Sequence, residues 1–239
     1  MRAAVMQPYF FPYLGYFSLI KHTDRFIFLD TVQFIKHGWI ERNRILKPDG
    51  GWQYFNVPLV GHSSFAKIKD VRVDNSVNWR RRILSQVGHY KRKAPYYRDT
   101  MEVLDHALSI DTDSIVKLDE HALKSVCRYL DIPANFNILT EMELKYDVAQ
   151  AADEWSLNIC RAMGIEEYWN PEGGIKFFDC GKYDAAGIII NFLKINLKPY
   201  YQAGCDFEPG LSILDAMMFN SPESIKVLLN DFILLPRND

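Results

Sequence analysis

Residues 6–20, MQPYFFPYLGYFSLI, concentrate side chains that can bind a ligand. The stretch holds six aromatic residues, two prolines, one glycine and one side-chain amide. Tyrosine rings can stack on a sugar or a base, and phenol and amide groups are costly to bury without hydrogen-bond partners. A glycine lets backbone approach a ligand, and the N–H groups at a helix start can bind an anion. An aromatic plug of the core is the alternative. The residues predicted to line a ligand site are Gln7, Tyr9, Tyr13, Gly15 and Tyr16.

A second polar cluster lies in residues 29–45, LDTVQFIKHGWIERNRI. Its cationic side chains can bind phosphate, the arginines through a bidentate fork. Its aspartate can act as a base or bind a sugar hydroxyl group, its indole can stack, and its amides can form hydrogen bonds. An exposed basic hairpin or helix is the alternative. Asp30 is the predicted base, and the predicted substrate-binding residues are Gln33, Lys36, Trp39, Arg42, Asn43 and Arg44.

The segment FEPGLSILD, residues 207–215, offers a third set of polar groups. Ser212 and Asp215 are three residues apart and share a face of the predicted helix, whereas Glu208 precedes that helix. A carboxylate at Glu208 can orient an amine. We predict that this helix start packs against the opening loop, so that the three residues complete one site. A helix cap plus a surface acid is the alternative.

Motifs for metals, cofactors and covalent catalysis are lacking. The four cysteines form no CxxC pair and the six histidines no HExxH pair, so we predict neither a metal site nor a cofactor. Gly173 and Gly174 can form a backbone nest for an anion or a plain turn, without the GxGxxG or GKS spacing of nucleotide-binding loops. Cys180 is expected to be a buried thiol rather than a nucleophile.

The elements that position these residues follow from hydrophobic patterns and turn signals. Residues 2–7 and 25–30 are predicted strands that flank a helix over 13–22, which is the opening of a parallel α/β unit with Asp30 at its ligand-binding end. A strand over 50–60 is predicted to pair with residues 66–74. Further helices are predicted over 77–90, 115–130, 151–163, 212–220 and 222–233, and further strands over 136–140 and 166–170. The predicted fold class is α/β, with a parallel-led sheet, flanking helices and a largely helical second half.

Charge divides the chain of 239 residues. Residues 1–98 hold 17 lysines and arginines against 6 acidic residues, residues 99–239 hold 11 against 24, and the net charge is −2. The basic part should attract anions such as phosphates. We predict a basic α/β part over 1–105 with the aromatic loop and an acidic, helix-rich part over 106–239, or one continuous domain.

The first residues lead straight into a predicted strand, and no apolar run reaches the roughly 20 residues that span a bilayer. We therefore expect no signal peptide, no membrane span and a cytoplasmic location.

Six segments carry a family resemblance. In chain order they are AVMQPYFFPYLGYFSLI, DTVQFIKHGWIERNRI, WQYFNVPL, YKRKAPYY, the Gly-Gly stretch and FEPGLSILDAMMFN. Over nearly the whole chain they resemble the WbqC-like protein family, most specifically at the opening QPYF and the closing FEPGLSILD. The resemblance implies a role in the biosynthesis of amino sugars and of surface polysaccharides such as O-antigen. The implied reaction modifies a sugar amine, for example by adding an amino acid such as glycine.

The residues and the resemblance together predict a transferase that moves an acyl or aminoacyl group to the amino group of a nucleotide-linked sugar. Such chemistry needs a neutral amine, donors for the oxyanion and cations for the diphosphate. The acyl donor stays open; aminoacyl-tRNA is one donor that the basic part would attract. The predicted catalytic residues are Gln7, Asp30 and Glu208.

Two other functions stay open. One is a nucleotide-using transferase related to nucleotidyltransferases with an HxGH signature, although residues 13–16, YLGY, replace both histidines by tyrosine. The other is a non-catalytic protein that binds a nucleotide sugar or a carbohydrate through the same rings and cations. Product formation separates a transferase from a binding protein.

Overall fold

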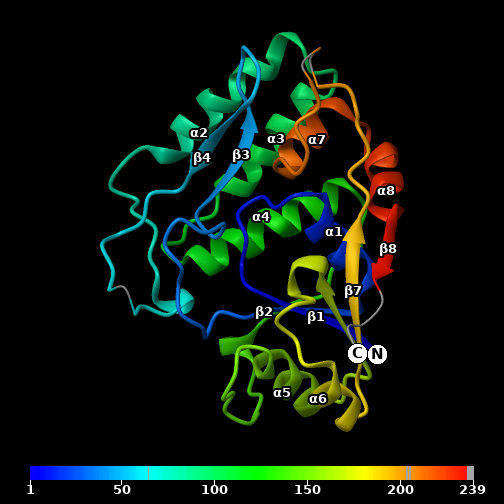
Figure 1. Cartoon of the computed structure of the whole chain (residues 1–239). Coiled ribbons are helices and arrows are strands. Elements are labelled where there is room, and N and C mark those ends of the chain that lie inside the picture. The colour runs from blue at the N-terminus through cyan, green and yellow to red at the C-terminus, as the bar shows by residue number, and fades with distance from the viewer. Residues whose placement is uncertain (64, 203, 205, 236–239) are drawn as a thin grey trace.

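Six strands form a mostly parallel sheet in the computed structural model, which describes residues 1–63, 65–202, 204 and 206–235 (Figure 1). The strand order is β5-β2-β1-β6-β7-β8, and β8 runs antiparallel to β7. The strands are β1 (Arg2–Met6), β2 (Arg25–Phe28), β5 (Phe136–Ile138), β6 (Glu167–Pro171), β7 (Ile189–Ile195) and β8 (Phe232–Leu235). Because β2 lies on one side of β1 and β6 on the other, the strand order reverses between β1 and β6. Open α/β sheets bind ligands at such a point, outside the carboxyl ends of the strands.

The alternation of side chains along β1 assigns the helices to two faces. Ala3 and Val5 are buried in one core cluster with α5 (Glu154–Met163) and α6 (Cys180–Ala185). Ala4, between them, is buried in a second cluster with α1 (Leu14–His22). Figure 1 shows α5 and α6 across the sheet from α1 and α4. The predicted α/β fold with a parallel-led sheet is therefore confirmed.

The connection from β2 to β5 adds a hairpin and a helical layer. β3 (Arg42–Leu46) pairs antiparallel with β4 (Trp52–Asn56). The helices that follow are η1 (Ile68–Asp70), α2 (Trp79–Val87), η2 (Gly88–Arg92), α3 (Tyr97–Leu108) and α4 (Ile115–Tyr129). Buried side chains at helical spacing hold α4 in the core, as its sequence pattern predicts.

The remaining elements close the fold around the sheet. α7 (Ile213–Phe219) packs on α3, and α8 (Pro222–Asn230) packs on α1. Single 3₁₀ turns, η3 (Leu139–Glu141) and η4 (Glu172–Gly174), follow β5 and β6. In the described part of the chain, no helix combines the length and the apolar character that crossing a membrane requires.

Three predictions about single elements are wrong. Residues 66–74 form η1 and isolated bridges instead of a strand; the bridge between Leu59 and Val73 joins them to the predicted partner segment, whereas β4 pairs with β3. The helix predicted over 77–90 ends at Val87, where Gly88 begins the 3₁₀ turn η2. The helix predicted over 222–233 ends at Asn230, because the apolar run that follows pairs with β7 as the edge strand β8.

Candidate functional site

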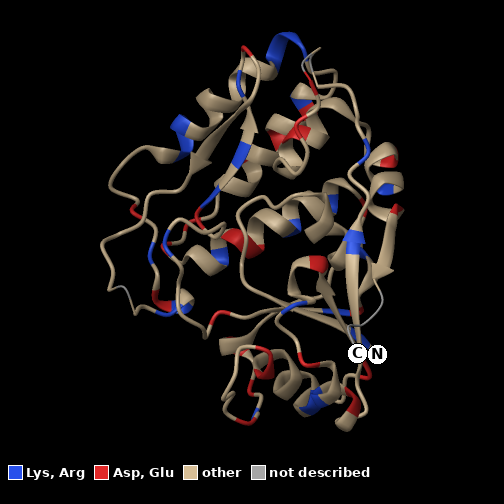
Figure 2. Cartoon of the chain, viewed as in Figure 1, with Lys and Arg blue, Asp and Glu red and all other residues tan. Residues whose placement is uncertain are grey.

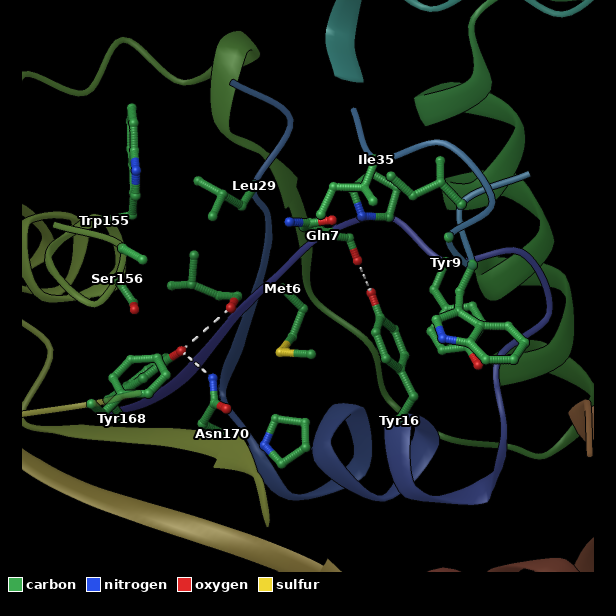
Figure 3. A pocket seen from close by; sticks show the side chains of 18 of the residues that line it. Met6, Gln7, Tyr9, Tyr16, Leu29, Ile35, Trp155, Ser156, Tyr168 and Asn170 are labelled. Carbon is green, nitrogen blue, oxygen red and sulfur yellow. Dashed lines mark hydrogen bonds between the residues drawn. The ribbon is translucent and has the colours of Figure 1, made fainter. Parts of the chain in front are cut away.

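A cavity of about 550 Å³ opens where the strand order reverses (Figure 3). The residues after β1 form its floor, and the ends of β2 and β6 and the start of α5 form its sides. From these elements, the lining residues include Met6, Gln7, Pro8, Leu29, Trp155, Ser156, Tyr168, Asn170 and Pro171. The cavity thus lies at the crevice that the sheet topology predicts.

Aromatic rings from the opening loop form the opposite wall. Tyr9 stacks on Trp39 with ring centres 5.8 Å apart, and Tyr16 meets Tyr9 edge-on at 5.5 Å. The Tyr16 hydroxyl donates a 2.7 Å hydrogen bond to the Gln7 carbonyl oxygen. Burial raises the pKa of the Tyr9, Tyr13 and Tyr16 hydroxyl groups above the ordinary value. These phenols are therefore neutral hydrogen-bonding groups at physiological pH.

Amide groups supply the polar contacts of the cavity. Asn170 donates from Nδ2 to the Tyr168 hydroxyl oxygen at 2.6 Å, which holds its side chain at the end of β6. The Gln7 side chain extends from the end of β1 between Leu29 and Ile35 (Figure 3). None of the side chains that line this cavity among the described residues carries a charge. The cavity therefore offers neutral donors and acceptors inside an apolar, aromatic wall.

A second cavity of about 520 Å³ adjoins the first. The two share lining residues, so Gln7, Ile35 and Trp155 stand at their junction. The second cavity adds Gln33 and Lys36, of which Lys36 brings a cation to its rim. The structure thus gathers seven of the predicted residues around two joined cavities: Gln7, Tyr9, Tyr13, Tyr16, Gln33, Lys36 and Trp39.

Two of the predicted glycines make room for neighbouring side chains. A Cβ atom at Gly15 would lie 2.5 Å from the ring of Tyr13, so the glycine lets that ring fold over the start of α1. A Cβ atom at Gly174 would collide with the Asn170 side-chain oxygen, so this glycine accommodates the amide at the end of β6. Gly173 has open space around its Cα atom. Gly15 and Gly174 therefore affect the cavity wall through Tyr13 and Asn170, which line it.

The predicted residues of β3 hold the loops that surround the cavity. Arg42 donates hydrogen bonds to the backbone oxygens of His37 and Gly38. Asn43 is buried and donates to the carbonyl oxygens of Phe10 at 3.2 Å and Phe11 at 2.6 Å.

Arg44 lies between two tryptophan rings. Its guanidinium carbon is 5.4 Å from the ring centre of Trp39 and 5.1 Å from that of Trp52. It also donates from Nη2 to the Gly210 oxygen at 3.2 Å. The side chain therefore joins the hairpin to the segment that precedes α7.

Asp30, the predicted base, lies outside both cavities. Its buried carboxylate accepts hydrogen bonds from the backbone N–H and the hydroxyl of Thr140, just after β5. A separate hollow of about 140 Å³ adjoins it, lined also by Lys69 and Lys117. Burial raises the pKa of Asp30. In this arrangement the carboxylate ties the ends of two neighbouring strands together.

The predicted contact between the late helix start and the opening loop is present. Ser212 donates from its hydroxyl to the Phe11 carbonyl oxygen at 2.8 Å, and the Ile213 N–H donates to the Pro12 carbonyl oxygen at 2.8 Å. Ser212, Glu208 and Asp215 nevertheless do not line the two cavities. The helix start therefore supports the back of the loop, and a catalytic role for Glu208 stays a prediction.

Asp215 belongs to a buried network instead. It accepts hydrogen bonds of 2.7 Å from Tyr90, Tyr200 and Gln202. Burial raises its pKa. Glu208 is half-buried nearby, where its N–H donates to the Gln202 side chain at 2.7 Å.

Sequence reasoning missed the side of the cavity formed by α5 and β6. The missed residues are Trp155, Ser156, Tyr168, Asn170 and Phe178. Open α/β sheets bind ligands at the carboxyl ends of their strands, which predicts a site residue at Asp30. The same rule applies to Asn170 at the end of β6. Nothing in the sequence indicates that α5 begins beside β1.

Most of the chain matches a known protein family and a known protein. A model described as the WbqC-like protein family matches residues 7–227. The uncharacterized protein Rv1507c of Mycobacterium tuberculosis is 27% identical over 227 residues, which cover 92% of this chain and 93% of that protein. No solved structure matches significantly.

Proposed function

The chain belongs to the WbqC-like protein family, and from this premise we propose that it is a transferase that acylates the amino group of a nucleotide-linked sugar. The observation that carries the proposal is the uncharged, aromatic cavity of about 550 Å³ at the carboxyl ends of β1 and β6. Its size lies within the usual range of small-molecule sites.

The walls of the cavity suit a sugar. Tyr9, Trp39 and Trp155 offer flat apolar surfaces, and Gln7 and Asn170 offer amides that can bond hydroxyl groups. A sugar amine in the same place would enter an environment without a carboxylate to pair with. Desolvation lowers the pKa of an amine, so the cavity favours the neutral form that can attack an acyl carbon.

The transfer then needs no covalent enzyme intermediate. The amine nitrogen attacks the carbonyl carbon of an activated acyl group, and a tetrahedral oxyanion forms. The bond to the leaving oxygen breaks, and that oxygen takes up the proton that the nitrogen releases. Gln7 lines both cavities, and in this proposal its amide N–H donates to the oxyanion. The second cavity, with Lys36 at its rim, is the proposed entrance for the donor.

Mass spectrometry tests the proposal directly. Amino-sugar nucleotides are incubated with the protein and one candidate donor at a time, including an aminoacyl-tRNA, and the amide product is sought. Gln7→Ala should lower turnover by a factor on the order of 10², the usual effect of losing an oxyanion donor. Asn220→Ala removes an amide at the end of α7, outside both cavities, and should retain full turnover.

A non-catalytic nucleotide-sugar binding protein is the second candidate. The described cavity wall has no carboxylate, histidine or lysine to act as a general base, which favours this candidate. Tight binding with no product from any donor would select this function and refute the transferase. Nucleotidyl transfer has less support, since the described residues of the main cavity wall include no cation to stabilise a triphosphate, and neutral tyrosines stand at the two histidine positions of HxGH.

A further inference from the structure

The outer side of the β3–β4 hairpin carries exposed aromatic rings and arginines. Phe55 of β4 is fully buried, whereas its neighbour Tyr54 and the preceding Trp52 are 38% and 37% exposed. The strand register places Arg44 opposite Tyr54, on the same side as these rings. We call this surface the outer hairpin face, and it consists of Arg42, Arg44, Trp52 and Tyr54.

A path of rings joins the outer hairpin face to the main cavity. Trp52 and Tyr54 have ring centres 5.0 Å apart, and Tyr54 and Trp39 have ring centres 6.4 Å apart. Trp39 lines the cavity and is 39% exposed. Trp39 at the mouth of the cavity therefore contacts Tyr54, and Tyr54 contacts Trp52.

The two arginines differ in what they can still bind. Arg42 already donates to the backbone oxygens of His37 and Gly38. Arg44 donates to one carbonyl oxygen, that of Gly210, and its buried Nε has no partner among the described residues. Arg44 thus keeps more of its N–H groups for an anion than Arg42 does, at its Nη atoms, and it lies beside Trp39 at the cavity mouth.

We infer that the outer hairpin face binds the nucleoside diphosphate part of the acceptor, with its base stacked on Trp52 beside the nearly perpendicular ring of Tyr54 and its diphosphate facing Arg44. The inference rests on the proposed function, which places the sugar in the main cavity. Bases stack on aromatic side chains and on arginine planes, and arginine binds phosphate oxygens through a fork. Two guanidiniums, of which Arg44 is the less occupied, and a short ring path fit one nucleotide, whereas a longer strand would need further cations for its phosphates.

Nucleotide titrations of the full chain, followed by tryptophan fluorescence, test this inference. The probes are UDP, dTDP and GDP, with pyrophosphate as the probe that lacks a base. Trp52→Ala and Tyr54→Ala should each weaken binding of the nucleotides on the order of tenfold and leave pyrophosphate binding unchanged. Arg44→Ala should weaken the binding of all four probes, and Arg44→Lys should not restore it, because lysine lacks the planar fork.

A control separates this surface from exposed aromatic residues in general. Phe65 is 81% exposed in another loop, and Phe65→Ala should leave nucleotide binding unchanged. Thermal unfolding of each variant checks that the fold survives. Nucleotide affinities that are equal in wild type, Trp52→Ala and Tyr54→Ala, or no nucleotide binding at all, would overturn the inference. A single-stranded RNA that binds far more tightly than UDP would show a different occupant and overturn it as well.

Turnover assays separate failure of this inference from failure of the proposed function. One outcome is that the amide forms at the same rate from the amino sugar with and without its nucleotide, with no change of that rate in Trp52→Ala. That result would support the transferase and refute the base subsite. If UDP binds through Trp52 and Tyr54 but no donor gives product, the base subsite stands and the transferase is refuted.

Discussion

Asp119 in α4 is a fully buried carboxyl group whose two oxygens have no hydrogen-bond partner among the described residues. Burial raises the pKa of Asp119 well above the ordinary value, and the negative charge of Glu41 raises it further. The folded chain therefore holds this proton more tightly than the unfolded chain does. For a carboxyl group of this kind, the free energy of unfolding falls as pH rises from the unfolded value of about 3.9 towards the raised folded value.

Asp119→Asn should weaken this dependence of stability on pH. The carboxamide cannot ionise, so the variant should lose less unfolding free energy than wild type between pH 4 and pH 7, as measured by urea denaturation at several pH values. A part of the change in unfolding free energy with pH (the slope) should persist in this variant, because burial also raises the pKa of Asp30, Glu41 and Asp215. Asp113→Asn, at a largely exposed carboxylate, is the matched control. An unchanged slope in Asp119→Asn would contradict this account.

Individual residues were predictable from sequence where they follow the first strand. Gln7 and the tyrosines after it stand at the carboxyl end of β1, and a strand followed by a helix is enough to place them there. Trp155 and Asn170 were not predictable, since they reach the cavity only through the packing of α5 and the position of β6 beside β1. Arg42 and Asn43 have the chemistry of ligand-binding groups, but the carbonyl oxygens of nearby loops occupy them.

At the scale of elements, the start of α1 is shaped by the missing side chain of Gly15. Replacing a helical glycine by alanine usually stabilises a protein by about 0.5–1 kcal/mol. Here the new Cβ would push the Tyr13 ring away from the cavity, since that ring lies 2.5 Å from the Cβ position. We therefore expect Gly15→Ala to keep or raise the melting temperature while it weakens binding of the proposed substrate, an amino-sugar nucleotide.

A double-mutant cycle checks that Gly15 acts through Tyr13. Tyr13→Ala removes the ring, so adding Gly15→Ala to that variant should cost no further affinity. Additive losses would instead mean that Gly15 affects the site by another route.

The opening loop is held from behind by buried polar groups of two other elements. Asn43 of β3 and Ser212 at the start of α7 both donate to the Phe11 carbonyl oxygen. Phe11 itself has a left-handed φ of 43°, a conformation that a bulky residue adopts only when its surroundings hold it there. Asn43→Ala would remove the side-chain donor to the Phe10 carbonyl oxygen and one of the two donors to the Phe11 carbonyl oxygen, and it should lower the free energy of unfolding by about 1–3 kcal/mol in urea titrations.

Asn56→Ala is the matched control for Asn43→Ala. Asn56 is exposed on the neighbouring strand, opposite Arg42, so its loss should change stability by less than about 0.5 kcal/mol. Equal effects of the two substitutions would show that the hydrogen bonds to the loop contribute little.

Element types were predictable where a pattern is local, and pairings were not. The 3.6-residue period of α4 and the glycine after α5 suffice to place those helices, and Gly164 indeed has a left-handed φ of 64°. The apolar run of the edge strand β8 follows α8 after a single residue, Asp231, so the sequence predicts a continuing helix, and only pairing with β7 makes the run a strand. Apolar and polar residues alternate over 66–74 as in a strand, but β4 pairs with β3, and an isolated bridge at Val73 joins 66–74 to the predicted partner segment.

At the scale of the whole molecule, the boundary in charge near residue 98 does not coincide with a boundary in the sheet (Figures 1 and 2; Figure 2 colours the charged residues). β1 and β2 come from the basic part, and their outer neighbours, β6 and β5, come from the acidic part. The main cavity likewise takes Gln7 from one part and Asn170 from the other. Composition shows how charge is distributed along the sequence, whereas the sheet forms by pairing of strands that are distant in sequence.

This arrangement predicts how two fragments of the chain should behave. Fragment 1–105 would contain β1 and β2 without β5, β6 or the helices α5 and α6, so Ala3 and Val5 would lose the core cluster that buries them. Fragment 106–239 would keep β6 and β7 but expose the β6 edge that pairs with β1. Each fragment alone should therefore show no cooperative transition in urea followed by circular dichroism, and the two expressed together should recover the transition of the intact chain. Cooperative unfolding of fragment 1–105 by itself would instead establish the basic part as a domain of its own.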